Sequence, residues 1–250
     1  MAGVTMGVFA IGVFATLFAG VSKGGFGSGA AFAGASILAL AVPPGQALGI
    51  MLPLLMLIDV VTLRPYWRQW SWPDARLLVL GGVPGVLLGA AFYRVADADL
   101  LRLLIGFISI GFVAWQVGAR AGLIGALRPL PVWGGALAGL VAGFTSFVSH
   151  AGGPPAAVYL LSRKLTKTQF QATTVLVFWL VNIAKAVPYG FLGIFTAQTL
   201  LFDLALAPFA VVGAWLGVKA HQIVPERMFF SITYLLLCVT GAKLIWDALS

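Results

Sequence analysis

Charged residues are scarce in this chain, and their scarcity excludes a soluble globular protein. Only 9% of the 250 residues are Asp, Glu, Lys or Arg, whereas 61% are hydrophobic. A water-soluble domain carries about 25% charged residues. The apolar residues form long runs that match the ~20 residues an α-helix needs to cross a hydrocarbon core of about 30 Å. The alternating stretches of about ten residues that build a membrane β-barrel are missing. The sequence therefore predicts an all-α integral membrane protein in a lipid bilayer.

Cysteine and histidine are almost absent, which limits the chemistry available to the chain. The one cysteine, Cys238, cannot form an internal disulfide. Together with two histidines that are far apart in the sequence, it cannot supply a metal site. We therefore predict no metal, no cofactor and no catalytic residue. The formal charge of +8 would suggest a nucleic-acid partner in a soluble protein. In a membrane protein the cytoplasmic loops collect Lys and Arg, so no nucleic-acid partner is predicted.

Ten apolar segments follow one another along the chain, separated by Pro, Gly and charged residues. They cover approximately residues 3–22, 28–42, 45–64, 75–93, 100–118, 132–148, 154–162, 169–187, 197–218 and 228–247. Segments two and seven are short for a complete membrane span. The pattern predicts eight to ten membrane segments, because the first two segments of each half either span the bilayer or form re-entrant hairpins.

The two halves of the chain resemble one another. When they are aligned with a shift of about 123 residues, Gln46 falls on Gln169 and Asp59 on Asn182. This ordered similarity predicts an internal repeat. We expect a first membrane repeat over 1–118, a cytoplasmic linker over 119–131 and a second membrane repeat over 132–250.

Basic residues predict how the chain is oriented. If the segments alternate sides, one face receives Lys23, Arg64, Arg68, Arg76, Arg120, Arg128, Arg163, Lys164, Lys167, Lys219 and Arg227. That face is predicted to be cytoplasmic, which places both termini outside. Because five segments is an odd number, the second repeat is predicted to be inverted relative to the first. Inverted repeats with short or broken helices at matching positions are a recurring design of secondary transporters.

Two glycine-rich breaks are the first candidate site. They are "SKGGFGSG" (Ser22–Gly29) and "SHAGGPP" (Ser149–Pro155). Irregular backbone at membrane depth survives only where protein buries it or a wet cavity borders it. Ser28 is predicted to cap a helix starting near Gly29, and Pro154 or Pro155 to occupy a first helical turn. Helix N-termini and glycine backbone bind anions, so the substrate-binding candidates are Ser22, Lys23, Gly24, Gly25, Gly27, Ser28, Gly29, Ser149, His150, Gly152, Gly153 and Pro154. The alternative is that the glycines only allow helices to pack closely.

Polar side chains inside the apolar runs are the second candidate site. Asp59 and its equivalent Asn182 lie within such runs, and Lys185 follows one turn after Asn182 on the same helical face. Charges inside a membrane are functional hypotheses by default, although Asp59 and Lys185 are also near enough to segment ends to snorkel. Gln46 and Gln169 either line the substrate pathway or cap helices.

Two residues are candidates for coupling transport to protons. Asp59 is an acid within an apolar run. His150 is a group that can exchange a proton near neutral pH, or else a donor that orders its loop.

The segments "AGVSKGGFGSG" and "AGFTSFVSHAGGPP", one in each half, resemble the TauE/SafE family of sulfite and organosulfonate exporters. The resemblance covers nearly the whole chain. It implies a secondary transporter of small sulfur-containing anions such as sulfite or sulfoacetate, driven by an ion gradient, in the inner membrane of a bacterium.

Two other functions stay open at this point. One is a passive anion channel on the same scaffold, and the other is a membrane-embedded enzyme or assembly partner. The sequence also leaves open a homodimer and the use of protons as the coupling ion.

Overall fold

The structure is a computed structural model that describes residues 5–26, 30–122, 130–223 and 226–250. All regular elements in these residues are helical. They are α1 (Met6–Val21), η1 (Ser22–Phe26), α2 (Phe32–Leu38), α3 (Pro44–Leu63), α4 (Trp72–Tyr93), α5 (Ala98–Arg120), α6 (Val132–Ser149), α7 (Gly153–Leu161), α8 (Lys167–Phe191), α9 (Ala197–Ile223) and α10 (Glu226–Leu249). Eight helices are long and apolar enough to cross a membrane. The predicted all-α membrane protein is therefore confirmed.

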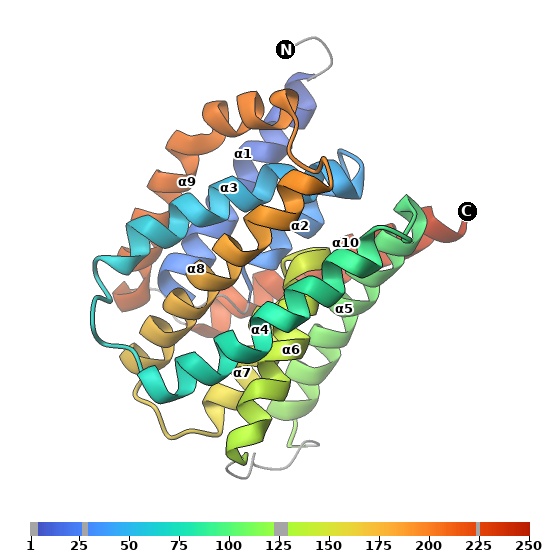
Figure 1. Cartoon of the computed structure of the whole chain (residues 1–250). Helices are drawn as coiled ribbons and strands as arrows, with labels where there is room; N and C mark the ends of the chain where they lie inside the picture. The colour runs from blue at the N-terminus through green and yellow to red at the C-terminus, as the bar shows by residue number, and fades with distance from the viewer. Residues whose placement is uncertain (1–4, 27–29, 123–129, 224–225) are drawn as a thin grey trace.

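The two short segments are short helices in the structure as well. Helix α2 has 7 residues and α7 has 9. The start of α1 and the segment that follows α2 lie side by side, because Val8, Val42 and Pro43 line one cavity. The backbone N–H of Leu130, before α6, donates to Ser162 Oγ, after α7, at 3.3 Å. Each short helix thus folds back along the long helix before it and forms a hairpin (Figure 1).

The first break differs from its prediction. Residues Ser22–Phe26 continue α1 as a π-helical turn instead of forming a loop. Helix α2 begins at Phe32, and Ala31 occupies its N-cap position without a side-chain hydrogen bond. The helix therefore starts at Phe32 and not near Gly29 as predicted, and Ser28, the predicted cap, lies outside the described residues. A π-turn widens the helix by one residue per turn, and such turns are frequent at functional sites.

The second break follows its prediction more closely. Helix α6 ends at Ser149, and its C-cap residue His150 adopts a left-handed conformation with φ 56° and ψ 10°. Helix α7 then begins with Pro in its first turn, as predicted for Pro154 and Pro155. A left-handed residue that is not glycine is uncommon and strained.

Helices from opposite halves pack together. Helix α9 lies along α1 and η1, and α4 lies along α6 (Figure 1). Glycines make both contacts close. A Cβ atom on Gly85 of α4 would meet the Leu140 carbonyl oxygen of α6 at 2.1 Å, and one on Gly25 of η1 would meet the Gly217 carbonyl oxygen of α9 at 2.3 Å. Close approach of this kind compensates for the lack of a hydrophobic driving force between helices in lipid.

The connections gather at two ends of the molecule. At one end the Arg163 side chain, after α7, forms an ion pair with Asp74 of α4 at 2.9 Å. At the opposite end a cavity of about 340 Å³ joins Gln46 of α3, Asp97 before α5 and Thr196 before α9. The middle of the bundle lies between these ends, and there η1 and the end of α6, which come from opposite halves of the chain, meet at one small cavity lined by Lys23 and His150.

Candidate functional site

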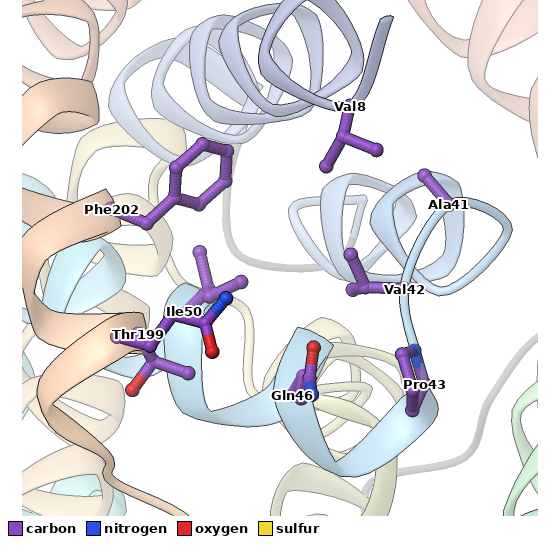
Figure 2. Close-up of a pocket in the computed structure, with 9 residues that line it drawn as sticks. Val8, Ala41, Val42, Pro43, Gln46, Ile50, Thr199 and Phe202 are labelled. Carbon is purple, nitrogen blue, oxygen red and sulfur yellow. The ribbon is translucent and has the colours of Figure 1, made fainter. Parts of the chain in front are cut away.

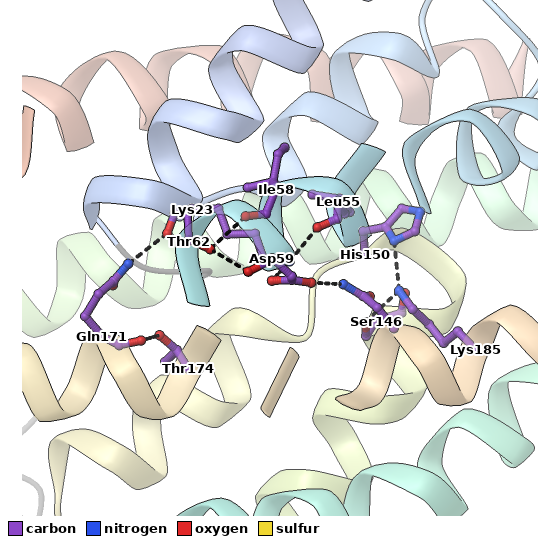
Figure 3. Close-up of polar contacts among 11 residues, drawn as sticks. Lys23, Leu55, Ile58, Asp59, Thr62, Ser146, His150, Gln171, Thr174 and Lys185 are labelled. Atoms are coloured by element: carbon purple, nitrogen blue, oxygen red, sulfur yellow. Dashed lines mark hydrogen bonds and ion pairs between the residues drawn. The ribbon is translucent and has the colours of Figure 1, made fainter. Parts of the chain in front are cut away.

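A buried ion pair joins the first break to α3. The Lys23 Nζ of η1 lies 2.6 Å from Asp59 Oδ1, and the two side chains are 2% and 0% exposed. The Asn182 amide of α8 donates to the other Asp59 oxygen at 2.8 Å (Figure 3). The two residues that the internal repeat aligned are therefore in direct contact. Snorkelling of Asp59 to the interface is excluded by its full burial.

A second buried lysine lies on the α6 side of the same region. The Lys185 Nζ, whose side chain is 0% exposed, contacts three atoms of α6 and its end: the Ser146 carbonyl at 3.0 Å, Ser146 Oγ at 3.0 Å and His150 Nδ1 at 2.9 Å (Figure 3). None of these three partners is a carboxylate. Lys185 is thus held in the interior by neutral groups, and it does not snorkel.

The hydrogen bonds of His150 assign its tautomer. Its Nε2 lies 3.2 Å from the Leu48 carbonyl oxygen of α3, which can only accept, so Nε2 carries the hydrogen. In the neutral ring Nδ1 is then the acceptor, and it accepts from Lys185. The left-handed backbone at His150 turns the ring from the end of α6 toward both partners. The strained backbone conformation of His150 therefore lies where α3, α6 and α8 meet.

These side chains surround a small cavity. It has a volume of about 10 Å³ and is lined by Lys23, Ser146, His150, Asn182 and Lys185, together with the apolar side chains of Ala31, Leu55 and Phe178. This is about the space that one water molecule occupies. We call the five polar residues and Asp59 the central cluster.

A larger cavity lies between the two breaks. It has a volume of about 400 Å³ and contacts both Gly25 and Gly153. Lys164 and Lys167 line it at the end of the molecule that carries the α7–α8 connection. Its remaining walls are mostly apolar or neutral polar: Phe26, Phe112, Gln116, Ala157, Leu160, Leu161, Leu165, Phe170, Gln171, Thr174 and Phe230.

One helix face of α8 separates the two cavities. Thr174 lines the large cavity, and Phe178, one turn further along, lines the small one. Gln171 also faces the large cavity, and its amide donates to the Lys23 carbonyl oxygen at 2.8 Å (Figure 3). Phe178 is 4% exposed and lies close to Gly152 of the second break. The central cluster is therefore separated from the large cavity by about one side-chain layer.

Comparison with known proteins identifies the family. The model of the family described as "Sulfite exporter TauE/SafE" matches residues 11–244, a range that contains both breaks and the whole central cluster. The chain belongs to the TauE/SafE family. Neither the curated proteins nor the solved structures that were compared include a match. The resemblance in the two glycine-rich segments is confirmed, and TauE/SafE proteins are transporters of sulfur-containing anions in membranes.

The break residues of this TauE/SafE protein have different surroundings. Gly24 and Gly25 face the α9 backbone, so close helix packing accounts for these two glycines. The Ser22 hydroxyl is buried and has no hydrogen-bond partner among the described residues. Ser149 Oγ donates to the Thr145 carbonyl oxygen within its own helix at 2.8 Å.

Gly152 packs against Phe178 and α6. Three further candidates of the first break, Gly27, Ser28 and Gly29, lie outside the described residues.

The two glutamines lie away from the central cluster. Gln169 is exposed and forms a capping box with Thr166 at the start of α8, which is the capping alternative. Gln46 is exposed near the start of α3 and lines a cavity of about 220 Å³ with Val8, Ile50 and Phe202 (Figure 2).

Two equivalent tyrosines support the break regions and were not among the site candidates. Tyr66 donates to the Gly24 carbonyl oxygen at 3.0 Å, and Tyr189 donates to the Phe147 carbonyl oxygen at 2.6 Å. Both bonds join residues 42 positions apart, and the repeat alignment places one bond on the other. The alignment of Tyr66 with Tyr189 was a signal in the sequence that could have found them. Ser146 and Gln171 had no such signal, because a serine or a glutamine in a membrane helix can serve only to hydrogen-bond a neighbouring helix.

Proposed function

We propose that this TauE/SafE protein is a secondary transporter that binds a small sulfur-containing anion, such as sulfite, sulfoacetate or a related sulfonate, at the central cluster. The observation that carries this proposal is Lys185. Its ammonium is buried in the bundle, and its three hydrogen-bond partners are neutral. A buried charge that no carboxylate contacts directly is costly. An anion beside Lys185 would supply a counter-ion.

The large cavity is the route to the cluster in this proposal. Lys164 and Lys167 at its wall attract anions from solution, and a positive rim of this kind raises the rate of encounter. Movement of Phe178 would connect the cavity with the central cluster. The large cavity and the cavities around Gln46 contact none of the cluster residues, so the cluster is closed off from both routes in this conformation.

Alternating access would use the two halves as moving parts. In the proposal residues 1–118 and 132–250 are inverted repeats joined by the linker 119–131. The equivalent tyrosine bonds and the contact between Asp59 and Asn182 support the repeat. The basic end of the molecule is cytoplasmic and both termini are outside, because Lys and Arg collect on the cytoplasmic side. Asp59 and His150 are the groups through which a proton gradient would be coupled.

Anion flux in proteoliposomes tests the site. The Lys185→Gln variant removes the buried charge and keeps a polar side chain, and we expect uptake of radiolabelled sulfite or sulfoacetate to fall by at least about tenfold, as for loss of a charged hydrogen-bonding partner. The matched control is Lys243→Gln, which removes an exposed lysine that pairs with Asp247 on α10. Unchanged flux in Lys185→Gln would refute the site.

An imposed gradient tests the coupling. A proton-coupled transporter accumulates anion above the external concentration when a pH difference is applied, whereas a passive channel only equilibrates it. Accumulation that is abolished by an uncoupler supports the transporter, and equilibration alone would replace it with the channel.

A further inference from the structure

The charges of the central cluster do not balance. The Lys23 ammonium is matched by the Asp59 carboxylate at 2.6 Å. His150 is neutral, because Nε2 donates to a carbonyl oxygen and Nδ1 accepts. Lys185 is the remaining charged group that lines the small cavity. The cluster therefore carries one surplus positive charge when both lysines are protonated.

The contacts of Lys185 are compatible with its protonated form. Its Nζ has three neighbours within hydrogen-bond distance, and two of them, the Ser146 carbonyl and His150 Nδ1, can only accept. The third, Ser146 Oγ, can accept the third hydrogen. An ammonium has three hydrogens to donate, which is the number of neighbours present.

From this balance we infer that the central cluster is selective for anions with a single negative charge, and that Asp59 sets this selectivity by neutralising Lys23. This inference rests on the proposed function and narrows its substrates to the singly charged ones, hydrogen sulfite and monosulfonates, in preference to the dianion sulfoacetate. A singly charged sulfonate or hydrogen sulfite would leave the buried cluster neutral. A doubly charged anion would leave a net negative charge inside the bundle, and the cost of burying an ion in a low-dielectric interior rises steeply with its charge. Asp59 is a positioning residue here, because it acts on the anion through Lys23 and the local field.

Asn182 fits the same scheme. It is the equivalent of Asp59 in the second repeat, and it bonds to Asp59 through its amide at 2.8 Å. A second carboxylate at this position would cancel the surplus charge. The difference between Asp and Asn at equivalent positions therefore determines the net charge of the cluster.

Two probes of the same shape separate charge from size. Methanesulfonate carries one negative charge, and methylphosphonate has the same methyl group and three oxygens but becomes doubly charged at alkaline pH. We would measure how each inhibits anion uptake by the wild-type protein in proteoliposomes at a pH where methylphosphonate is a dianion. We expect methanesulfonate to inhibit at concentrations at least about tenfold lower, because a second buried charge has no cationic partner.

The Asp59→Asn variant is expected to reverse much of this preference. It keeps the side-chain shape and raises the surplus charge of the cluster by one. Relative inhibition by the dianion should rise by about a hundredfold, which is the effect of one unit charge across about 6 Å at an effective dielectric constant of about 20. The control is Asp203→Asn, which removes a carboxylate that is buried in α9 and is not part of the central cluster. The relative inhibition of this control by the two probes should equal that of the wild type.

The outcomes distinguish the inference from the function on which it rests. Equal inhibition by the two probes, stronger inhibition by the dianion, or inhibition by neither would overturn the charge selectivity while anion uptake itself persisted. Absence of uptake of any small sulfur-containing anion by the wild-type protein would instead overturn the proposed function. The wild-type comparison needs no variant, so it decides the question even where Asp59→Asn fails to fold.

Discussion

Replacement of Lys23 by methionine is the sharpest test of how the interior is held together. The substitution removes the ammonium from Asp59 and leaves a chain of similar length. Asp59 is then a fully buried carboxylate whose one remaining side-chain partner among the described residues is the Asn182 amide. Both halves of the chain are affected, because Lys23 lies in the first half and Asn182 in the second.

The expected loss of stability is large because the ion pair is buried away from solvent. Breaking a buried ion pair by removing one partner destabilises a protein by about 3–5 kcal/mol. For a chain of this size about 1 kcal/mol corresponds to a shift of roughly 2–4 °C in Tm. We therefore expect Lys23→Met to lower the Tm by about 10 °C. Replacing both partners, as in Lys23→Met with Asp59→Asn, leaves no buried charge at this position and should recover most of the loss.

The assay is thermal unfolding of detergent-purified protein, followed by the fraction that remains monodisperse after heating. The two single variants and the double variant form a double-mutant cycle, and an exposed lysine substitution, Lys243→Met, is the control. A Lys23→Met variant no less stable than this control would refute the ion pair. Additive losses in the double variant would show that Lys23 and Asp59 do not interact.

Two further predictions concern helix packing and the charge of the cluster. Gly85→Ala places a methyl group about 2.1 Å from a carbonyl oxygen of α6 and is expected to lower the Tm by several degrees. The control is Gly111→Ala, where the structure leaves open space and the Tm should change little. Similar shifts in Tm for both variants would refute close packing between α4 and α6. Asn182→Asp creates two adjacent carboxylates that share one proton at low pH. Anion affinity, measured by inhibition of uptake, should therefore approach that of the wild type at low pH and fall as the pH rises. An affinity that does not depend on pH would contradict the contact between residue 182 and Asp59.

The sequence predicted the helices well because their signals are local. Long apolar runs, Pro in first turns and the breaks near Ser22 and Ser149 were readable from composition, and helices lie close to the predicted positions. The bounds of the first break were wrong because a π-turn through Gly24 and Gly25 has no distinct signal in the sequence. Nothing local distinguishes it from a flexible glycine-rich loop.

The partners of the polar residues were much less predictable. From the sequence, Gln46 and Gln169 were as strong candidates for the site as Asp59 and Asn182, because each pair aligns in the repeat. The structure brings the second pair into contact and leaves Gln169 as an exposed helix cap. Repeat alignment indicates equivalent positions but carries no information about which of them face the shared interior.

What the sequence by itself determined is that this chain is a membrane protein of long apolar helices interrupted by glycine or proline breaks, because hydrophobic length and such breaks act within one segment. Only the tertiary structure decided that Lys23 pairs with Asp59 while Lys185 has neutral partners. Those contacts depend on how η1, α3, α6 and α8 pack across more than one hundred residues of chain. The surplus positive charge that we infer at the centre of the protein is a consequence of that packing.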